Sequence, residues 1–267
     1  MLAPDEPAPF EIVDGSADPP VIVVCDHASN RIPRALAGLG LDDHHLRDHI
    51  AWDIGAAGVA RRLAARLGAH AVISAYSRLV VDLNRSPRDA TAYPPISDGI
   101  LVPGNVGLDG EAKLARERAL FDPYHDAIAA LVEACSDGDS VPVFLGVHSF
   151  TPRFYRTERP WHVGVLWDKD PRIALPLLRS LRADAELTIG DNEPYSGRHP
   201  ADYSIDTHAE AHGLAHVGIE LRQDLIVDER GQARLAGILG AALEAILTDD
   251  ALYRRFLGTR AREADET

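Results

Sequence analysis

Short apolar runs recur along this chain, separated by longer segments with helical spacing. The first run, VIVVC at 21–25, contains four consecutive β-branched residues and is typical of a strand buried on both faces. In the segment 46–68 that follows, apolar residues recur near helical spacing at Ile50, Ile54, Val59, Leu63 and Leu67. This alternation predicts an α/β fold with three layers, α/β/α, around a mixed, mainly parallel central sheet.

The same reading extends along the whole chain. We expect strands at 21–27, 69–76, 78–84, 141–150, 162–168 and 215–224, and helices near 46–68, 111–136, 171–184, 203–212 and 232–248. No internal repeat and no domain-scale linker interrupts this pattern, so the sequence indicates a single domain over residues 1–267. Within it, residues 1–18 are expected to form an extended lead-in and residues 259–267 a charged tail, neither with a functional role.

The charge balance argues against polyanionic partners. Lys and Arg number 27 against 41 Asp and Glu, a net charge of −14, whereas nucleic acids and anionic membrane surfaces are bound through basic patches. Cys25 and Cys135 are the only cysteines and do not indicate a disulfide framework. No apolar run approaches the roughly 18 residues of a membrane span, and the first residues lack the order of a signal peptide. We therefore expect a cytoplasmic protein; the sequence contains no signal for its oligomeric state.

Polar and charged residues follow four of the predicted strands where each strand ends. In chain order they are Asp26 and His27, Asp82 to Arg85, His148 and Ser149, and Glu220 to Arg222. A single histidine at a strand end more often makes a cap or a satisfied hydrogen bond. Four such ends at one edge of an open α/β sheet instead favour a ligand site at that edge.

Two histidines at the ends of separate buried strands, with a carboxylate nearby, are the ingredients of a catalytic site for Zn²⁺ or another divalent metal. We expect His27 and His148 to be ligands. The third ligand is predicted to be Asp53, which lies among apolar residues in HIAWDIGA, although an exposed or capping aspartate would show the same pattern. Asn30 is the weaker candidate, because an amide oxygen is a poor ligand for zinc.

Glu220 lies in HVGIELRQD, a run that otherwise indicates a buried strand, so its carboxylate must be paired or face a cleft. In a cleft it would serve as the general base; the alternative is a buried ion pair with Arg222 or Arg78. Arg78 and Arg85 bracket RLVVDLNR. We expect one guanidinium, that of Arg85, to bind a substrate carboxylate and the other, that of Arg78, to stabilise a developing oxyanion.

Six segments, taken in order, resemble the N-formylglutamate amidohydrolase family. They are CDHASNRIP, AWDIGA, YSRLVVDLNRSP, GVHSFTP, NEPYSG and HVGIELRQDLI, which together span residues 25–226. That family is similar to the zinc carboxypeptidases and the aspartoacylases, so the resemblance implies their α/β fold with a mixed central sheet. It also implies hydrolysis of an amide bond at a metal centre.

The resemblance assigns roles to individual residues. It implies zinc ligands at His27 and His148, a catalytic glutamate at Glu220, and carboxylate binding by Asn84 and Arg85. Tyr195, in NEPYSG, would be a substrate-contacting tyrosine, and Arg222 is a further candidate for substrate binding. Asn30 occupies the place of the glutamate ligand of the peptidases, and Asp53 is the substitute that we expect.

The leading hypothesis is a metal-dependent hydrolase that cleaves the amide of an N-formyl or other N-acyl amino acid, a small-molecule substrate. Two alternatives remain. In one, Cys25 is the nucleophile of an amidase, with His27 or His148 as its base. In the other, the protein binds an acidic metabolite through its arginines and has no catalytic activity, because the ligand set at Asn30 is incomplete.

Overall fold

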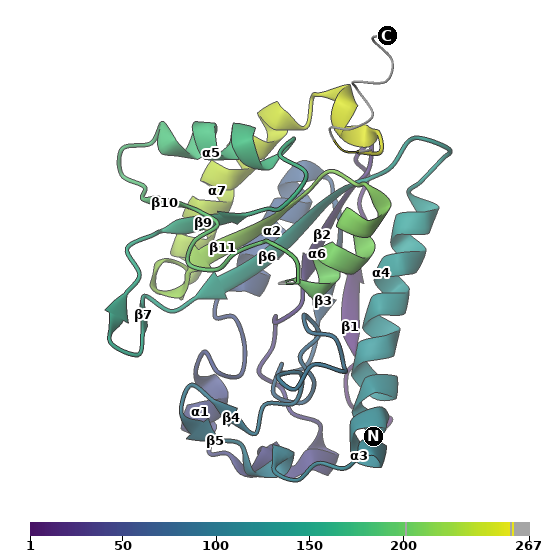
Figure 1. The fold of residues 1–267 in the computed structure, drawn as a ribbon, viewed down its shortest axis with the longest axis vertical. Coiled ribbons are helices and arrows are strands. Elements are labelled where there is room, and N and C mark those ends of the chain that lie inside the picture. Colours follow the sequence, from purple (N-terminus) through teal and green to yellow (C-terminus); the bar gives the residue numbers. More distant parts are fainter. Residues whose placement is uncertain (201, 257, 259–267) are drawn as a thin grey trace.

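The computed structural model describes residues 1–200, 202–256 and 258. A seven-stranded sheet lies at its centre, with strand order β1-β3-β2-β6-β11-β9-β10 (Figure 1). These strands are β1 (Phe10–Val13), β2 (Val21–Cys25), β3 (His70–Ser74), β6 (Val143–Phe150), β9 (Val163–Leu166), β10 (Ile189–Asp191) and β11 (His216–Arg222). Two small hairpins lie outside the sheet, formed by β4 (Ile96–Ser97) with β5 (Ile100–Leu101) and by β7 (Arg153–Phe154) with β8 (Thr157–Glu158).

The sheet is mixed and mainly parallel, as expected from the sequence. Its four central strands, β3, β2, β6 and β11, are parallel neighbours, and β10 is parallel to β9. Antiparallel pairing occurs between β1 and β3 and between β11 and β9. The carboxyl ends of β2, β6 and β11 therefore meet at one edge of the sheet, where a ligand site is expected.

Alternate residues of β2 enter two separate hydrophobic cores. Val21, Val23 and Cys25 belong to one core, and Ile22 and Val24 belong to the other. Side chains alternate between the faces of a strand, so a strand that is apolar at every position must be covered on both sides. This is the physical reason for the three layers.

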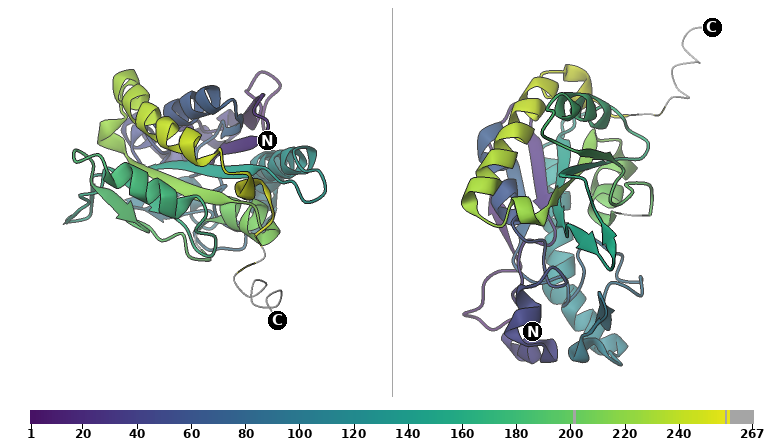
Figure 2. Two further views of the ribbon diagram at one scale, coloured as in Figure 1. Left: turned by 90° about the horizontal axis from the view of Figure 1, so that it is seen from above. Right: turned by 90° about the vertical axis from the view of Figure 1, so that its left-hand side faces the viewer.

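Helices cover both faces. The first core contains residues of α2 (Ala56–Leu67), α5 (Ala174–Arg182) and α7 (Glu229–Ile246), and Figure 2 shows α2 and α7 side by side. The second core contains residues of α4 (Asp122–Ala134) and α6 (Tyr203–His208). The shorter helices α1 (Asp43–Arg47) and α3 (Gly110–Arg116) lie with the β4–β5 hairpin, below the sheet in Figure 1. The predicted α/β/α architecture is confirmed.

Three expected segments differ from the structure: 78–84, 1–18 and the helix over 46–68. Residues 78–84 form turns and not a strand, and Leu79, Val80 and Val81 are buried in the second core without joining the sheet. The preceding strand β3 is already paired on both sides, with β1 and β2, so residues 78–84 cannot pair with it as a further strand. The segment 1–18 contains β1, which is part of the sheet. The predicted tail 259–267 lies outside the described residues.

The helix expected over 46–68 is divided into α1 and α2. Gly55, which precedes α2, has φ of 82°, and a Cβ atom built there would lie 2.1 Å from the carbonyl oxygen of Ile226. Only glycine accommodates this approach without strain. The turn before Gly55 carries Asp53, whose backbone N–H donates to the carbonyl of His27 at 2.9 Å. The break between the helices thus places Asp53 at the end of β2.

Among the residues that the structure describes, no helix combines the length and the apolar character needed to cross a lipid bilayer.

Candidate active site

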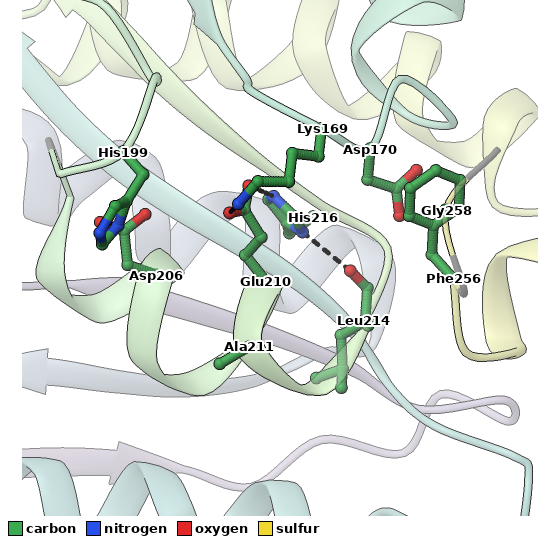
Figure 3. Close-up of a pocket in the computed structure, with 11 residues that line it drawn as sticks. Lys169, Asp170, His199, Asp206, Glu210, Ala211, Leu214, His216, Phe256 and Gly258 are labelled. Atoms are coloured by element: carbon green, nitrogen blue, oxygen red, sulfur yellow. Dashed lines mark hydrogen bonds and ion pairs between the residues drawn. The ribbon is translucent and has the colours of Figure 1, made fainter. Parts of the chain in front are cut away.

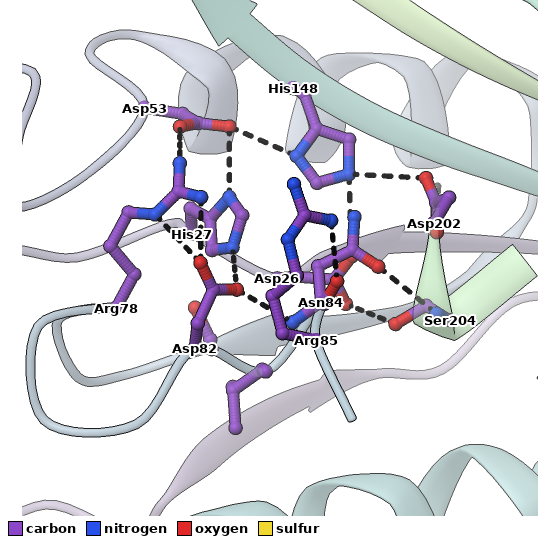
Figure 4. A network of polar contacts seen from close by, with 12 residues as sticks. Asp26, His27, Asp53, Arg78, Asp82, Asn84, Arg85, His148, Asp202 and Ser204 are labelled. Atoms are coloured by element: carbon purple, nitrogen blue, oxygen red, sulfur yellow. Dashed lines mark hydrogen bonds and ion pairs between the residues drawn. The ribbon is translucent and has the colours of Figure 1, made fainter. Parts of the chain in front are cut away.

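A cavity of about 460 Å³ opens at the carboxyl ends of β2, β6 and β11 (Figure 4). Most of the predicted site residues line it: His27, Asp53, Arg78, Asn84, Arg85, His148, Tyr195 and Glu220. The structure thus gathers into one cavity residues that are up to 193 positions apart in the chain (27 to 220).

His27, Asp53 and His148 form a compact buried group. The Nδ1 atom of His27 lies 3.3 Å from Oδ2 of Asp53, and the Nδ1 atom of His148 lies 3.0 Å from the same oxygen. One donor atom from each of the three residues lies within 4.8 Å of the other two. Ligands bound to one Zn²⁺ at about 2.1 Å in tetrahedral geometry are about 3.4 Å apart, so the spacing suits a single ion.

The second nitrogen of each imidazole faces another buried carboxylate. Nε2 of His27 lies 2.7 Å from Oδ1 of Asp82, and Nε2 of His148 lies 3.3 Å from Oδ2 of Asp26. At His27 the carboxylate is at hydrogen-bond distance, so it holds the proton on Nε2 and leaves the Nδ1 lone pair directed at the common centre. At His148 the longer contact is electrostatic and is not a hydrogen bond. Metal-binding histidines show this arrangement, because the outer carboxylate orients the ring and raises its basicity.

The electrostatics of the group also favour a cation. With Nε2 protonated, neutral rings would direct both Nδ1 lone pairs at the Asp53 carboxylate, a repulsion that a bound proton or metal ion removes. Burial alone would lower the pKa of His148, but its contacts with Asp26 and Asp53 outweigh burial and hold that pKa well above its usual value. Burial would likewise raise the pKa of Asp53, yet the two histidines keep it far below its ordinary value. His27, Asp53 and His148 can therefore hold a metal ion.

Two contacts fix the Asp53 carboxylate, and a third fixes its backbone. Its Oδ2 atom accepts a hydrogen bond from the backbone N–H of Ser149 at 3.2 Å, and its Oδ1 atom lies 3.6 Å from the guanidinium of Arg78. The backbone bond from Asp53 to His27 ties the same turn to β2. Asp53 is neither an exposed residue nor a helix cap, which were the alternatives for it.

Glu220 lies across the cavity on β11. It pairs in register with His148 on β6 and with Gly164 on β9, and the residue is 7% exposed. Its Oε2 atom is buried without a hydrogen-bond partner, and among the described residues no ion pair joins Glu220 to Arg78 or Arg222. Burial raises the pKa of Glu220 to about 7. A carboxyl group with this pKa exchanges protons readily near neutral pH, as a general base must.

Gly164 leaves room for this carboxylate. A Cβ atom built on Gly164 would lie 3.2 Å from Cβ of Glu220 and 2.2 Å from the carbonyl oxygen of Glu193. Any larger residue at this position of β9 would therefore collide with the backbone beside the cavity.

Arg78 and Asp82 form a bidentate ion pair beside the histidines. Nε and one terminal nitrogen of Arg78 donate to Oδ2 of Asp82 at 3.0 and 2.6 Å, while Oδ1 of Asp82 faces His27. Burial would lower the pKa of Arg78, but Asp82 and Asp53 raise it above its usual value, so the guanidinium is a permanent cation at the cavity wall. It lies close enough to the metal-binding group to stabilise negative charge that develops there.

Asn84 and Arg85 follow on the same turn. The side-chain oxygen of Asn84 accepts from the backbone N–H of Ser204 at 3.0 Å, and the guanidinium of Arg85 donates to the carbonyl of Asn84 at 3.0 Å. Both side chains line the cavity. On the far wall, the hydroxyl of Tyr195 accepts from Arg159 at 3.0 Å, and the Arg159 guanidinium lies 4.8 Å from the centre of the Tyr195 ring.

Three other residues from the sequence analysis lie away from this cavity. Asn30 donates its side-chain amide to the carbonyl of Leu46 at 2.8 Å and does not line the cavity. Arg222 does not line the cavity, and its Nε donates to Asp224 at 2.8 Å. Cys25 is fully buried in the first core and does not line the cavity, and burial raises its thiol pKa far above the usual value. A thiol in this state is not a nucleophile at neutral pH.

Sequence reasoning assigned no role to three carboxylates that complete the site. Asp26 accepts from the hydroxyls of Tyr124 and Ser204 at 2.7 and 2.8 Å and faces His148. Asp82 joins His27 to Arg78. Asp202 lies 3.9 Å from Nε2 of His148, and its pKa is raised by burial. Asp26 and Asp82 follow apolar runs in the sequence, which predicts that they lie at the same sheet edge as the histidines, whereas nothing near Asp202 in the sequence indicates that it approaches His148.

Comparison with known proteins agrees with this geometry. The sequence model of the N-formylglutamate amidohydrolase family matches residues 19–227. The crystal structure of a gene product from Agrobacterium tumefaciens superposes with a TM-score of 0.86 at 36% identity, over 92% of this chain and 98% of the other. The crystal structure of N-formylglutamate amidohydrolase from Ralstonia eutropha JMP134 superposes with a TM-score of 0.68 at 19% identity, over 90% of this chain and 98% of the other, and so shares the fold. A search of curated proteins finds no significant match. The chain belongs to the N-formylglutamate amidohydrolase family.

Proposed function

We propose that this protein is a metal-dependent hydrolase that cleaves the amide bond of an N-formyl or other N-acyl amino acid, with N-formylglutamate as the first substrate to test. One observation carries the proposal. Two imidazoles and one carboxylate converge through Nδ1, Nδ1 and Oδ2, and each imidazole is backed by its own buried carboxylate. This is the donor set of a catalytic zinc site with room for a further ligand.

His27, Asp53 and His148 would hold the ion. When bound there, Zn²⁺ or another divalent metal supplies Lewis acidity, lowering the pKa of water and polarising the amide carbonyl. Asp82 keeps the Nε2 proton on His27, and the charge of Asp26 favours a proton on Nε2 of His148, so that Nδ1 of each ring would remain available for the metal.

Glu220 acts as the proton shuttle. Its unpartnered Oε2 accepts a proton from the attacking water and returns it to the leaving nitrogen, which cannot depart as an anion. The raised pKa of Glu220 suits both proton transfers. A carboxyl group with an ordinary, lower pKa would be a weaker base and would accept the proton of water less readily.

Arg78 and Arg85 provide the positive charge of the cavity. Arg78 stabilises the negative charge that develops on the carbonyl oxygen, and Arg85 with Asn84 binds the carboxylate of the amino acid. Tyr195 closes the opposite wall, where Arg159 orients its hydroxyl.

The experiment measures the release of the free amine from N-formylglutamate and a panel of N-formyl and N-acetyl amino acids. It compares protein as purified, protein stripped with a chelator, and stripped protein reloaded with Zn²⁺, Mn²⁺ or Co²⁺. We expect activity to disappear on stripping and to return with metal. Full activity in protein shown by elemental analysis to be metal-free would contradict the mechanism. Substrate binding without turnover in metal-loaded protein would instead support a binding function.

A further inference from the structure

A second cavity, of about 410 Å³, lies on the α6 side of the sheet near the opposite end of β11 (Figure 3). Its walls include Lys169, Asp206, Glu210, Leu214, His216 and Phe256. None of the residues that line it lines the candidate active site. Any ligand it holds therefore makes its contacts outside the candidate active site.

His216 is the most deeply buried polar residue of this cavity. Its side chain belongs to the first residue of β11, and the residue is 1% exposed. Nδ1 lies 2.8 Å from the carbonyl oxygen of Leu214, to which it must donate, so in the neutral ring Nε2 carries the lone pair. Nε2 is buried and has no hydrogen-bond partner among the described residues. A buried acceptor without a partner is costly, and a donor from a ligand would satisfy it.

One carboxylate stands next to this nitrogen, and a second lines the same cavity. Glu210, in the short turn η4 (Glu210–His212), places Oε2 3.9 Å from Nε2 of His216, while its Oε1 pairs with the ammonium of Lys169. Asp206, four residues earlier on α6, accepts from Nδ1 of His199 at 2.8 Å through Oδ2. Its Oδ1 atom is buried without a partner in the described chain. The cavity thus offers two acceptors 3.9 Å apart, Nε2 of His216 and Oε2 of Glu210, together with the Asp206 carboxylate.

The charge of the walls defines the ligand further. Asp170, also at the wall, is neutralised by a bidentate pair with Arg172. Asp206 and Glu210 contribute two carboxylates, of which Glu210 is paired with the ammonium of Lys169 and Asp206 with the imidazole of His199. Among the described residues that line the cavity, Lys169 is the one permanent cation, so the carboxylates outnumber it and favour a cationic ligand.

We propose that this cavity is a binding site for the primary ammonium group of a small amino compound, which donates to Nε2 of His216 and to Oε2 of Glu210, with the Asp206 carboxylate as further negative charge in the same cavity. A primary ammonium has N–H donors for both acceptors and carries one positive charge, which suits a cavity lined by two carboxylates. Leu214 and Phe256 provide apolar surface for the carbon atoms of the ligand.

The same residues do not suit a metal ion. Glu210 already has one oxygen on the Lys169 ammonium, and His216, Asp206 and Glu210 do not each place a donor atom within 4.8 Å of the other two. In the described part of the chain, the only group of three metal-competent donors within 4.8 Å of one another is His27, Asp53 and His148.

The site is connected to the first cavity through α6. Asp202, which caps this helix, lines the first cavity near His148, and Asp206 lines the second cavity one turn later. An amine bound at Asp206 therefore contacts the helix that also positions Asp202. Amines are one of the two products of amide hydrolysis, so the ligand class is one that the proposed reaction releases.

Calorimetric titration with ethylammonium tests the proposal, with tetramethylammonium as the matched probe that has the same charge and no N–H donor. We expect one saturable site for ethylammonium and none for tetramethylammonium. Because carboxylates also line the first cavity, substitutions in the second cavity are needed to assign the binding to it. Equal binding of both ions, or no saturable binding of ethylammonium, would overturn the proposal. This comparison needs only the wild-type protein.

Two variants locate the site. Glu210→Gln and Asp206→Asn each remove one charge with little change in volume, and each is expected to weaken ethylammonium binding about tenfold or more. Glu244→Gln, on α7 away from the cavity, is the matched control and is expected to bind as the wild type does. Binding that survives both cavity substitutions unchanged would place the amine elsewhere and refute the assignment.

Discussion

Glu220 on β11 and His148 on β6 are register partners on adjacent parallel strands, and both side chains line the same cavity. The relation between the proposed base and a proposed metal ligand is therefore set by the hydrogen-bond ladder at the centre of the sheet. Sites held by regular elements are positioned more accurately than sites held by loops. Asp53 in the metal-binding group comes from a turn, and that turn is tied to His27 and Ser149 by hydrogen bonds.

Substitution of Glu220 by Gln is expected to reduce kcat by about 10²–10⁴-fold, because the amide side chain cannot accept the proton of the attacking water. Metal content, measured by elemental analysis, should remain at the wild-type level, since Glu220 is outside the metal-binding group. Glu111→Gln, an exposed substitution on α3, serves as the control and should be fully active. A Glu220→Gln enzyme within tenfold of wild-type activity would remove Glu220 from the mechanism.

The pH dependence of the reaction should report the same carboxyl group. Burial raises the pKa of Glu220 to about 7, and the base acts only when deprotonated, so kcat/KM should fall as the pH decreases through this region. A bound divalent cation favours the carboxylate, so the metal-loaded enzyme should show its acid limb below pH 7. A profile of kcat/KM that is flat from pH 5 to 8 would contradict this assignment.

Much of the sheet could be predicted from the sequence, because a run such as VIVVC has no stable environment except between two apolar layers. The run at 78–84 shows the limit of this reasoning. Its apolar residues are buried as expected, but they are buried in turns, and periodicity does not distinguish a short buried strand from a short buried loop. Which strand edges remain free depends on pairing between strands that are distant in the sequence. Such pairing is not visible in the local pattern of apolar residues.

The residues of the candidate active site could be predicted from the sequence about as well as the strands of the sheet. His27, His148 and Glu220 follow or end apolar runs, and strand ends in an α/β sheet converge by topology. The carboxylates that orient the histidines could not be paired with them in advance. Asp82 reaches His27 from 55 residues away through a turn, and Asp202 reaches His148 from the start of α6. Such pairs depend on the path of connecting segments, for which the sequence carries no periodic signal.

Substitution of Arg85 by Met should raise KM by about 10–100-fold with a smaller effect on kcat, because the carboxylate of the amino acid loses a charged donor in both the ground state and the transition state. Steady-state kinetics of the wild type and of Arg85→Met are compared on an N-acyl amino acid and on the same compound with its carboxylate converted to a carboxamide. The two enzymes should cleave the carboxamide equally. An equal loss on the two substrates would show that Arg85 does not recognise the carboxylate.

Substitution of Cys25 by Ala distinguishes the metal mechanism from a thiol mechanism. The side chain is fully buried in the first core, so its loss should lower the free energy of unfolding by about 1 kcal/mol and leave kcat close to wild type. Activity assays and urea unfolding measure the two effects. Complete loss of activity in a folded Cys25→Ala protein with a full complement of metal would restore the thiol hypothesis.

Substitution of Asp82 by Asn should weaken metal binding without removing a ligand. Asp82 accepts at 2.7 Å from Nε2 of His27 and pairs with Arg78, so the Asp82→Asn variant would lose the charge that holds the imidazole proton at Nε2. We expect metal affinity to fall about 10–100-fold, as measured by competition with a chromophoric chelator. Asp126→Asn, an exposed substitution on α4, is the matched control and should bind metal as tightly as wild type.

Saturating metal should restore most of the activity of Asp82→Asn if Asp82 acts only through His27. A kcat that remains low at saturation would instead show that the Arg78–Asp82 pair also contributes directly, because Arg78 then loses the partner that holds it beside Asp53.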